Sequence, residues 1–277
     1  MIFTKFDVRW GFNNIHIREE DQWKGVFITP FGLFEPTIMF FGFCNGLPTF
    51  QSFMNHIFVN MITKHWLKIY MDNLGIHTQG DLALHHEHTQ CVLLHLWAHG
   101  LSLKLSKCTF DVPHIKFLGM IIGQGKIEMD SIKLSAIKKW KPPASVKGVW
   151  SFLGFANFYC KFIPNFSHVV APLNLLTRKD QPWAWTPLQQ CAFNTLKTTF
   201  SSGPVLTISD VTCLFSIITG ASLFAAGAIL LQADTNGDLH PCAYFSHTFL
   251  SAEWNYDIYD QELLVVILAL TEWRQYV

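Results

Sequence analysis

The tetrapeptide Tyr-Met-Asp-Asn at positions 70–73 lies between an apolar run at 66–69 and an apolar pair at 74–75. This pattern predicts a β-hairpin that carries Asp72 at its tip. A second aspartate, Asp7, lies far upstream in a strand-like segment. Two strands whose ends both carry carboxylates can hold divalent metal ions against a triphosphate. Asn73 supplies no carboxylate, so one position of that arrangement is neutral.

The composition sets broad limits on the chain. Its 277 residues are 50% hydrophobic, which is enough for about two domains and a sizeable core. The formal net charge is zero, and this does not favour nucleic-acid binding, which depends on lysine and arginine. The segment 133–147 nevertheless holds lysines at 133, 138, 139, 141 and 147 and no acid. A local basic face therefore matters more than the total charge.

The cysteines indicate a reducing compartment. There are seven of them, an odd number, far apart and without a Cys-x-x-Cys spacing, which argues against a disulfide framework and against a zinc site. We expect an intracellular protein, cytoplasmic or nuclear, that is not secreted. Because no stretch approaches eighteen apolar residues, we expect no membrane span.

Apolar periodicity predicts alternating strands and helices. Strands are expected at 8–17 and 25–29, with a turn at 30–32, and helices at 48–62 and 82–99. The pair Pro142-Pro143 predicts a hinge, and Ser145 is expected to open a new helix. Further strands are expected at 214–219, 226–232 and 241–246. This is an α+β pattern.

Several separated motifs resemble one family in its own order. They are Phe-Thr-Lys-Phe-Asp-Val-Arg-Trp-Gly-Phe at 3–12, Thr-Pro-Phe-Gly-Leu-Phe-Glu at 29–35, Asn-Gly-Leu-Pro-Thr-Phe-Gln at 45–51, Ser-Phe-Leu-Gly-Phe-Ala-Asn-Phe-Tyr at 151–159 and Trp-Asn-Tyr at 254–256. Together they resemble the reverse transcriptase and RNase H polyprotein region of gypsy-type LTR retrotransposons. The usual hairpin motif of that family is Tyr-x-Asp-Asp, so this chain looks like a degenerate, truncated copy.

The resemblance implies an α+β fold in three parts. Residues 1–125 would form the reverse transcriptase palm, an antiparallel sheet with packed helices and truncated fingers. Residues 126–203 would form the helices of the thumb and connection. Residues 204–277 would form a partial RNase H-like domain, a mixed sheet with one helix.

The resemblance also implies a metal site. Asp7 and Asp72 match the aspartates that bind Mg²⁺ or Mn²⁺, and Asn73 occupies a third catalytic position in degenerate form. A lone strand-end aspartate is usually a solvated residue, but Asp7 precedes a Gly-Phe pair and a Tyr-x-Asp motif. We therefore expect Asp7 and Asp72 to be catalytic.

Other matched positions imply contacts with the nucleotide and the primer. Phe12 matches the aromatic gate under the sugar, although alone it would be a core residue. Gln51, Met71 and Lys107 match positions near the nucleotide, and Gln51 could equally be a surface amide. The segment Phe117, Leu118 and Gly119 matches the primer grip.

The RNase H-like part departs from the family at a metal ligand. Gly220 stands where the family has its first aspartate, whereas Glu262 matches the second acid on the helix. Glycine offers no ligand, so the sequence does not support two-ion hydrolysis of RNA.

Two classes of function remain open. The first is an RNA-directed DNA polymerase that uses an RNA or DNA template-primer and dNTP, with other polyprotein segments as further expected partners. The second is a catalytically inactive retroelement remnant that at most binds nucleic acid.

A group of histidines on the predicted helix at 82–99 invites a metal-site interpretation, but a solvated helix is expected there instead. The group comprises His85, His86, His88, His95 and His99.

Overall fold

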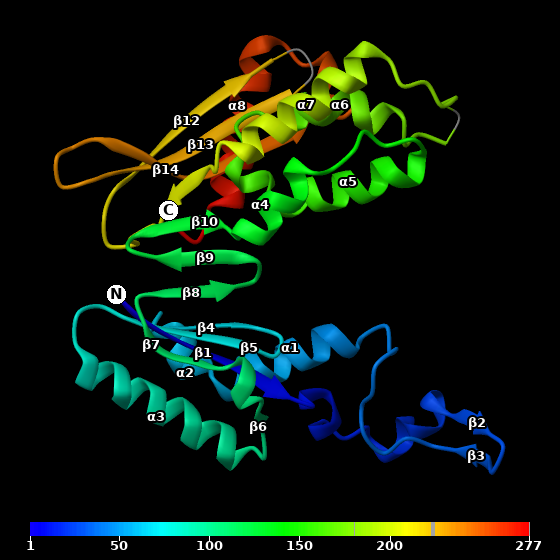
Figure 1. Cartoon of the computed structure of the whole chain (residues 1–277), viewed down its shortest axis with the longest axis vertical. Coiled ribbons are helices and arrows are strands. Elements are labelled where there is room, and N and C mark those ends of the chain that lie inside the picture. The colour runs from blue at the N-terminus through cyan, green and yellow to red at the C-terminus, as the bar shows by residue number, and fades with distance from the viewer. Residues whose placement is uncertain (180, 223–224, 277) are drawn as a thin grey trace. The chain divides into compact units, whose positions relative to one another are not determined.

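The computed structural model describes residues 1–179, 181–222 and 225–276 and divides into two compact units (Figure 1). The first unit contains Met1–Leu118 and Ile122–Gln124, and the second contains Gly119–Ile121 and the chain from Gly125 onward. Each unit has a hydrophobic core of its own. The helices after residue 125 and the C-terminal sheet both lie in the second unit, so the two units do not separate them. The three-part division expected from the sequence therefore remains a prediction.

The strand β1 (Ile2–Arg9) organises the sheet of the first unit. It pairs antiparallel with β5 (Asn73–Thr78), β6 (Ser102–Leu103) and β7 (Thr109–Val112), while β4 (Leu67–Tyr70) pairs with β5. The β4–β5 hairpin predicted from the sequence is therefore confirmed.

The two faces of this sheet have different surroundings. Phe6, Leu74 and Ile76 are fully buried in a cluster with apolar residues of the helices. Because side chains alternate along a strand, Asp7 is on the opposite face from Phe6. On that opposite face the ring of Phe117 covers Gly75, where an added Cβ would lie 3.3 Å from the ring. The helices therefore bury one face, and Asp7 belongs to the other.

Three helices belong to the first unit: α1 (Gly46–Ile57), α2 (Val59–Thr63) and α3 (Leu82–Ala98). Figure 1 shows α3 running along the β1–β5 sheet. The sequence predicted one helix at 48–62, and this is wrong in detail because Phe58 leaves helical geometry at φ −107° and ψ 13°. The prediction for α3 is confirmed: the Asp81 side chain accepts a hydrogen bond from the N–H of Ala83 and caps the helix.

The segment after β1 differs from the prediction. The strand expected at 8–17 is wrong: β1 starts at Ile2 and ends at Arg9, because Trp10 adopts a left-handed conformation with φ 56°. Short 3-10 helices follow at Gly11–Asn14 (η1) and Glu19–Gly25 (η2). The strand predicted at 25–29 is then found as β2 (Phe27–Thr29), and after a tight turn it pairs with β3 (Gly32–Phe34) in a hairpin.

The remaining short elements lead to the division between the units. The 3-10 helix η3 (Leu105–Lys107) follows β6 and lies next to β1. After β7 come the strands β8 (His114–Phe117) and β9 (Met120–Gly123), and the boundary between the two units falls within β9.

In the second unit, β10 (Lys126–Met129) pairs with β11 (Val205–Thr207). Between these strands the chain forms helices whose large side chains, such as Phe152, Phe193 and Phe200, fill the core. These helices are α4 (Ser131–Lys138), α5 (Val146–Phe158), α6 (Phe166–Leu175) and α7 (Pro187–Ser201), with the 3-10 helix η4 (Cys160–Phe162) after α5. Ser145 caps α5 through the N–H of Gly148, so the predicted helix start is confirmed.

The C-terminal sheet contains β12 (Phe215–Ala221), β13 (Ala225–Ala233) and β14 (Leu239–Thr248), paired antiparallel. The 3-10 helix η5 (Glu253–Asn255) leads to α8 (Ile258–Glu272), which packs on β12 and β13 (Figure 1). The predicted strands and helix are confirmed. Within the described ranges, no helix has the length and apolar character needed to cross a membrane.

The histidine-rich helix α3 is not simply solvated. His85 is fully buried, and its Nε2 lies 2.8 Å from the Thr4 Oγ1, while its Nδ1 lies 2.9 Å from the Thr78 Oγ1. His85 therefore joins α3 to β1 and β5, and the expectation of a solvated helix is wrong at this position. Across the described residues, no group of three or more His, Cys, Asp or Glu side chains is placed to hold a metal ion.

Candidate active site

The backbone brings the two predicted metal-binding acids to one end of the sheet. In the β1–β5 register Asp7 lies opposite Asn73, and the N–H of Val8 donates to the carbonyl of Asp72 over 2.8 Å. This bond makes Asp7 and Asn73 a non-hydrogen-bonded pair, the type of antiparallel pair whose side chains approach most closely. Asp72 is the next residue, in the turn. Segments 65 positions apart in the sequence therefore meet here.

The carboxylate of Asp7 already has a basic partner. Its side chain is only 9% exposed, and its Oδ2 lies 3.2 Å from the Nζ of Lys107, whose side chain is 55% exposed. The N–H of Lys104 also donates to the carbonyl of Asp7 over 2.9 Å, which holds η3 beside the strand. The resemblance places Lys107 near the nucleotide, and its ion pair with Asp7 was not predicted from the sequence.

The carboxylate of Asp72 is bound by its neighbour. The Nδ2 of Asn73 donates to the Oδ1 of Asp72 over 2.8 Å. An aspartate at position 73 could not donate this bond, and its charge would repel the other two carboxylates. The amide thus stabilises the acidic end of the hairpin without a cation.

The side chains at this end of the sheet offer oxygen atoms of the kind that hard divalent cations prefer. Mg²⁺ and its analogues bind carboxylate and amide carbonyl oxygens. Asp7 and Asp72 offer carboxylates, and Asn73 retains its amide oxygen because only its nitrogen is used toward Asp72. Because Asn73 is neutral, these three side chains carry one negative charge fewer than a Tyr-x-Asp-Asp motif would provide.

The hairpin tip is held by α1. Met71 has a left-handed backbone with φ 55°, and its N–H donates to the Oε1 of Gln51 over 2.7 Å. The Nε2 of Gln51 donates in turn to the Oδ1 of Asn55 over 2.8 Å. Gln51 is therefore partly buried and engaged, not a free surface amide. Asn55 was missed by sequence reasoning, although its i+4 spacing from Gln51 on a helix was a usable signal.

The ring of Phe12 is fixed by other aromatic rings. It stacks on Phe50 with centroids 4.8 Å apart and lies 4.9 Å from the ring centroid of Phe41. A Cβ at Gly11 would come within 2.4 Å of the Phe50 ring, so glycine is needed beside Phe12. The structure thus holds Phe12 rigidly, while its role as a sugar gate stays a prediction.

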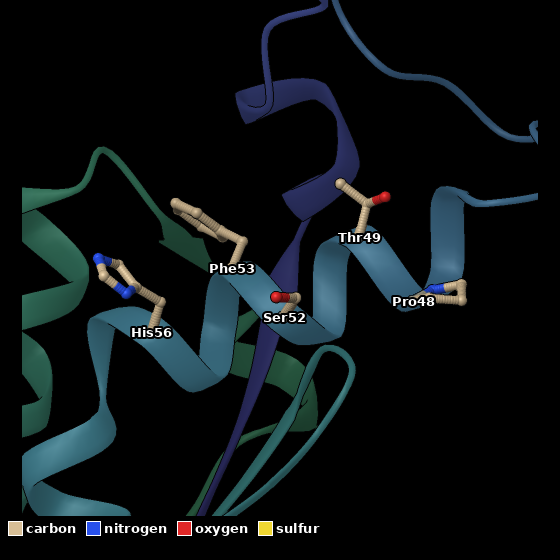
Figure 2. A pocket seen from close by; sticks show the side chains of 5 residues that line it. All are labelled: Pro48, Thr49, Ser52, Phe53 and His56. Carbon is tan, nitrogen blue, oxygen red and sulfur yellow. The ribbon is translucent and has the colours of Figure 1, made fainter.

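A shallow cavity of about 580 Å³ lies on α1, the helix that carries Gln51 (Figure 2). Its lining combines hydroxyl groups, an imidazole and an aromatic ring, from Pro48, Thr49, Ser52, Phe53 and His56. In Figure 2 the side chains of Thr49, Phe53 and His56 extend from the same side of the helix. No role for this surface was predicted from the sequence.

The predicted primer grip lies at the end of β8. Phe117 is 7% exposed and rests on Gly75, whereas Leu118 and Gly119 adopt positive φ angles of 49° and 75°. The hydroxyl of Tyr159 donates to the carbonyl of Gly119 over 2.9 Å within the second unit. Phe117 and Leu118 belong to the first unit.

The RNase H-like part lacks a carboxylate at its matched strand position. Gly220 is exposed on β12 and pairs with Gly227 of β13, and no atom lies within 4 Å of where its Cβ would be. Glu262 is exposed on α8. There is therefore room for a side chain at position 220, but none is present.

The fold and the site define a polymerase-type palm followed by an RNase H-like sheet. Residues 1–122 match the family described as reverse transcriptase (RNA-dependent DNA polymerase), and residues 185–277 match the RNase H-like domain found in reverse transcriptase. The two matches confirm the family predicted from the sequence, a reverse transcriptase followed by an RNase H-like domain.

Its relatives include transposon polyproteins of fission yeast. The chain is 34% identical over 275 residues to the Transposon Tf2-7 polyprotein and to the Transposon Tf2-3 polyprotein of Schizosaccharomyces pombe. The match covers 99% of this chain and 20% of each relative. The chain thus spans about a fifth of the length of the curated relatives it matches.

Solved structures of foamy viral protease-reverse transcriptase have the same fold. The complex with an RNA/DNA hybrid gives a TM-score of 0.83 at 23% identity and covers 98% of this chain and 36% of that chain. A second complex, with double-stranded DNA, gives 0.81 at 22% identity and covers 99% and 48%. The predicted α+β reverse transcriptase fold is confirmed.

Proposed function

We propose that this chain is the RNA-directed DNA polymerase region of a retrotransposon polyprotein, a nucleotidyltransferase that extends a primer on an RNA or DNA template. The observation that best supports this proposal is the pairing of β1 with β5. In this pairing Asp7 lies opposite Asn73, and the N–H of Val8 donates to the carbonyl of Asp72. The family match and the transposon relatives support the proposal. The intracellular location expected from the cysteines is part of it.

The cofactor in this proposal is Mg²⁺ or Mn²⁺. Asp7 and Asp72 would hold it, with the amide oxygen of Asn73 as a neutral third ligand. Ions held by these residues in a two-metal mechanism would supply activation of the attacking hydroxyl and stabilisation of charge on the transferred phosphoryl group. With one carboxylate fewer, this chain is expected to be a slow polymerase.

The aromatic and amide groups around the acids would position the substrates. The ring of Phe12, held by Phe50, would lie under the deoxyribose of a dNTP and leave no room for a 2′-hydroxyl. Gln51 fixes the backbone of Met71, which would contact the primer terminus. These roles follow from the resemblance, and the contacts in the structure explain how the side chains are kept in place.

The proposed nucleic-acid partner is a template-primer. The similar foamy viral structures are complexes with an RNA/DNA hybrid or with double-stranded DNA. In this chain, Phe117, Leu118 and Gly119 would grip the primer. The lysines at 133, 138, 139, 141 and 147 are exposed on and beside α4 and α5, where they could neutralise phosphates. Because the chain spans a fifth of its relatives, other polyprotein segments are proposed as further partners.

We propose that the RNase H-like part does not hydrolyse RNA. Two-ion hydrolysis needs a carboxylate on the strand, and Gly220 has no side chain to supply it. Glu262 alone on α8 cannot replace that ligand pair. This part would then serve as a structural or nucleic-acid-binding extension of the polymerase region.

One observation favours a second candidate, a non-catalytic remnant that at most binds nucleic acid. Asp7 is paired with Lys107 and Asp72 with Asn73, so the acidic end is satisfied by the chain's own groups. A chain of this kind would keep the fold and the basic surface without nucleotidyl transfer.

Template-directed incorporation separates the two candidates. The purified chain is given a primed RNA template, one labelled dNTP and Mn²⁺ or Mg²⁺, beside the Asp7→Asn/Asp72→Asn double variant. We expect extension by the original chain and none by the double variant, because both proposed cation ligands have lost their charge. No incorporation by either protein, with template bound, would leave the remnant as the function. Equal incorporation by the two proteins would show that Asp7 and Asp72 are not the catalytic acids and would overturn the proposed site.

A further inference from the structure

The ion pair between Lys107 and Asp7 engages one of the two carboxylate oxygens of a proposed cation ligand. The Nζ of Lys107 lies 3.2 Å from the Oδ2 of Asp7, and that carboxylate has little contact with solvent. A carboxylate in such a place needs a compensating charge, because burial penalises an unpaired ion. Lys107 supplies the compensation in this structure.

The lysine is delivered to this place by the backbone. The N–H of Lys104 donates to the carbonyl of Asp7, and the N–H of Lys107 donates to the carbonyl of Lys104. These bonds fix η3 beside β1. The Lys107 side chain is nevertheless 55% exposed, so its ammonium group can leave Asp7 for solvent without disturbing the core.

An ammonium group and a divalent cation cannot share this position. Both are positive, and at hydrogen-bond distance from one carboxylate they would repel each other strongly. The site also carries one negative charge fewer than it would with an aspartate at position 73, because Asn73 is neutral and donates to Asp72. The site therefore attracts a divalent cation less strongly, and Lys107 competes with that cation more easily.

We propose that Lys107 is an internal counter-ion that competes with the divalent cation for Asp7, so that the cation binds only when the ammonium group leaves. This inference rests on the proposed function, since it concerns regulation of the same cation site. The competition lowers the affinity of the free chain for the cation and keeps Asp7 paired when no cation is present.

The test is Mn²⁺ binding to the whole chain, measured by electron paramagnetic resonance of the free ion. Lys107→Met removes the charge and keeps the length of the side chain. We expect it to bind Mn²⁺ about tenfold more tightly, the change expected when a competing charge-assisted contact is lost. Lys107→Arg keeps a competing cation and should bind no more tightly than the original. Lys104→Met removes the same charge from the same segment and should change the affinity by less than about twofold.

A second measurement follows the ammonium group itself, for use if Lys107→Met is poorly folded. On titration of the original chain with Mg²⁺, the side-chain NMR signals of Lys107 should shift toward those of a free lysine, and those of Lys104 should not. Unchanged Lys107 signals at saturating Mg²⁺ would overturn the inference.

The outcomes separate this inference from the proposed function. If Asp7→Asn abolishes Mn²⁺ binding while Lys107→Met binds no better than the original, the competition is refuted and the cation site stands. If Asp7→Asn and Asp72→Asn both bind Mn²⁺ as the original does, the cation lies elsewhere, and both proposals fail.

Discussion

Replacing Asn73 with aspartate is expected to raise template-directed dNTP incorporation by up to about a thousandfold. The new carboxylate would lie directly opposite Asp7, in the pair that brings side chains closest. One added charge at about 4 Å, with an effective dielectric of about 20, is worth about 4 kcal/mol before relaxation. The measurement is the steady-state rate of single-nucleotide extension with saturating Mn²⁺.

Two controls define what a gain in rate would mean. Asn73→Gln keeps a neutral amide and should give no increase. Asn73→Asp combined with Asp7→Asn should lose the increase, because the restored acid has no partner to share a cation. An Asn73→Asp chain that is no faster than the original would show that the missing carboxylate does not limit this protein.

Acid is expected to destabilise the first unit through His77. Burial, followed by the charges of Lys68, His65, His88 and His85, lowers the pKa of His77 from 6.5 to about 4. Between pH 6.5 and about 4, the unfolded state therefore binds a proton at His77 that the folded state does not bind. The resulting stability is complete above pH 6.5 and is lost as the pH falls toward about 4. The loss amounts to about 3 kcal/mol at most.

The variant His77→Asn tests this linkage by urea unfolding between pH 4.5 and pH 8. Between pH 4.5 and 6 the original chain should lose up to about 1.4 kcal/mol of unfolding free energy per pH unit more than the variant. Some slope should remain in the variant, because burial also lowers the pKa of His85 and of His88. Above about pH 7.5 the two profiles should run parallel. Identical slopes over the whole range would show that His77 is not the titrating group.

Local patterns were sufficient to predict much of the fold. The β4–β5 hairpin, the helix α3 and the C-terminal strands follow from apolar periodicity and from turn residues such as Gly100, which adopts φ 66° after α3. The interruption at Phe58 did not follow, because neither glycine nor proline marks it. The end of β1 was missed for a similar reason: Trp10 takes a left-handed conformation that its residue type does not favour.

Long-range pairings in the site were beyond the sequence. The motif resemblance selected Asp7 and Asp72, and the strand register places their backbones together. No local pattern indicates that Lys107 binds Asp7, because the two residues are a hundred positions apart and the bond depends on η3 docking beside β1. The burial of His85 was hidden likewise, since its threonine partners come from β1 and β5.

The central claim is that Asp7 and Asp72 share one divalent cation at the joined ends of β1 and β5. The most direct measurement is anomalous diffraction at the manganese edge from crystals of the whole chain grown with Mn²⁺. The account predicts a manganese peak bonded to carboxylate oxygens of both residues, with the Nζ of Lys107 displaced from Asp7. A manganese peak bonded to other residues, with Lys107 still on Asp7, would contradict it.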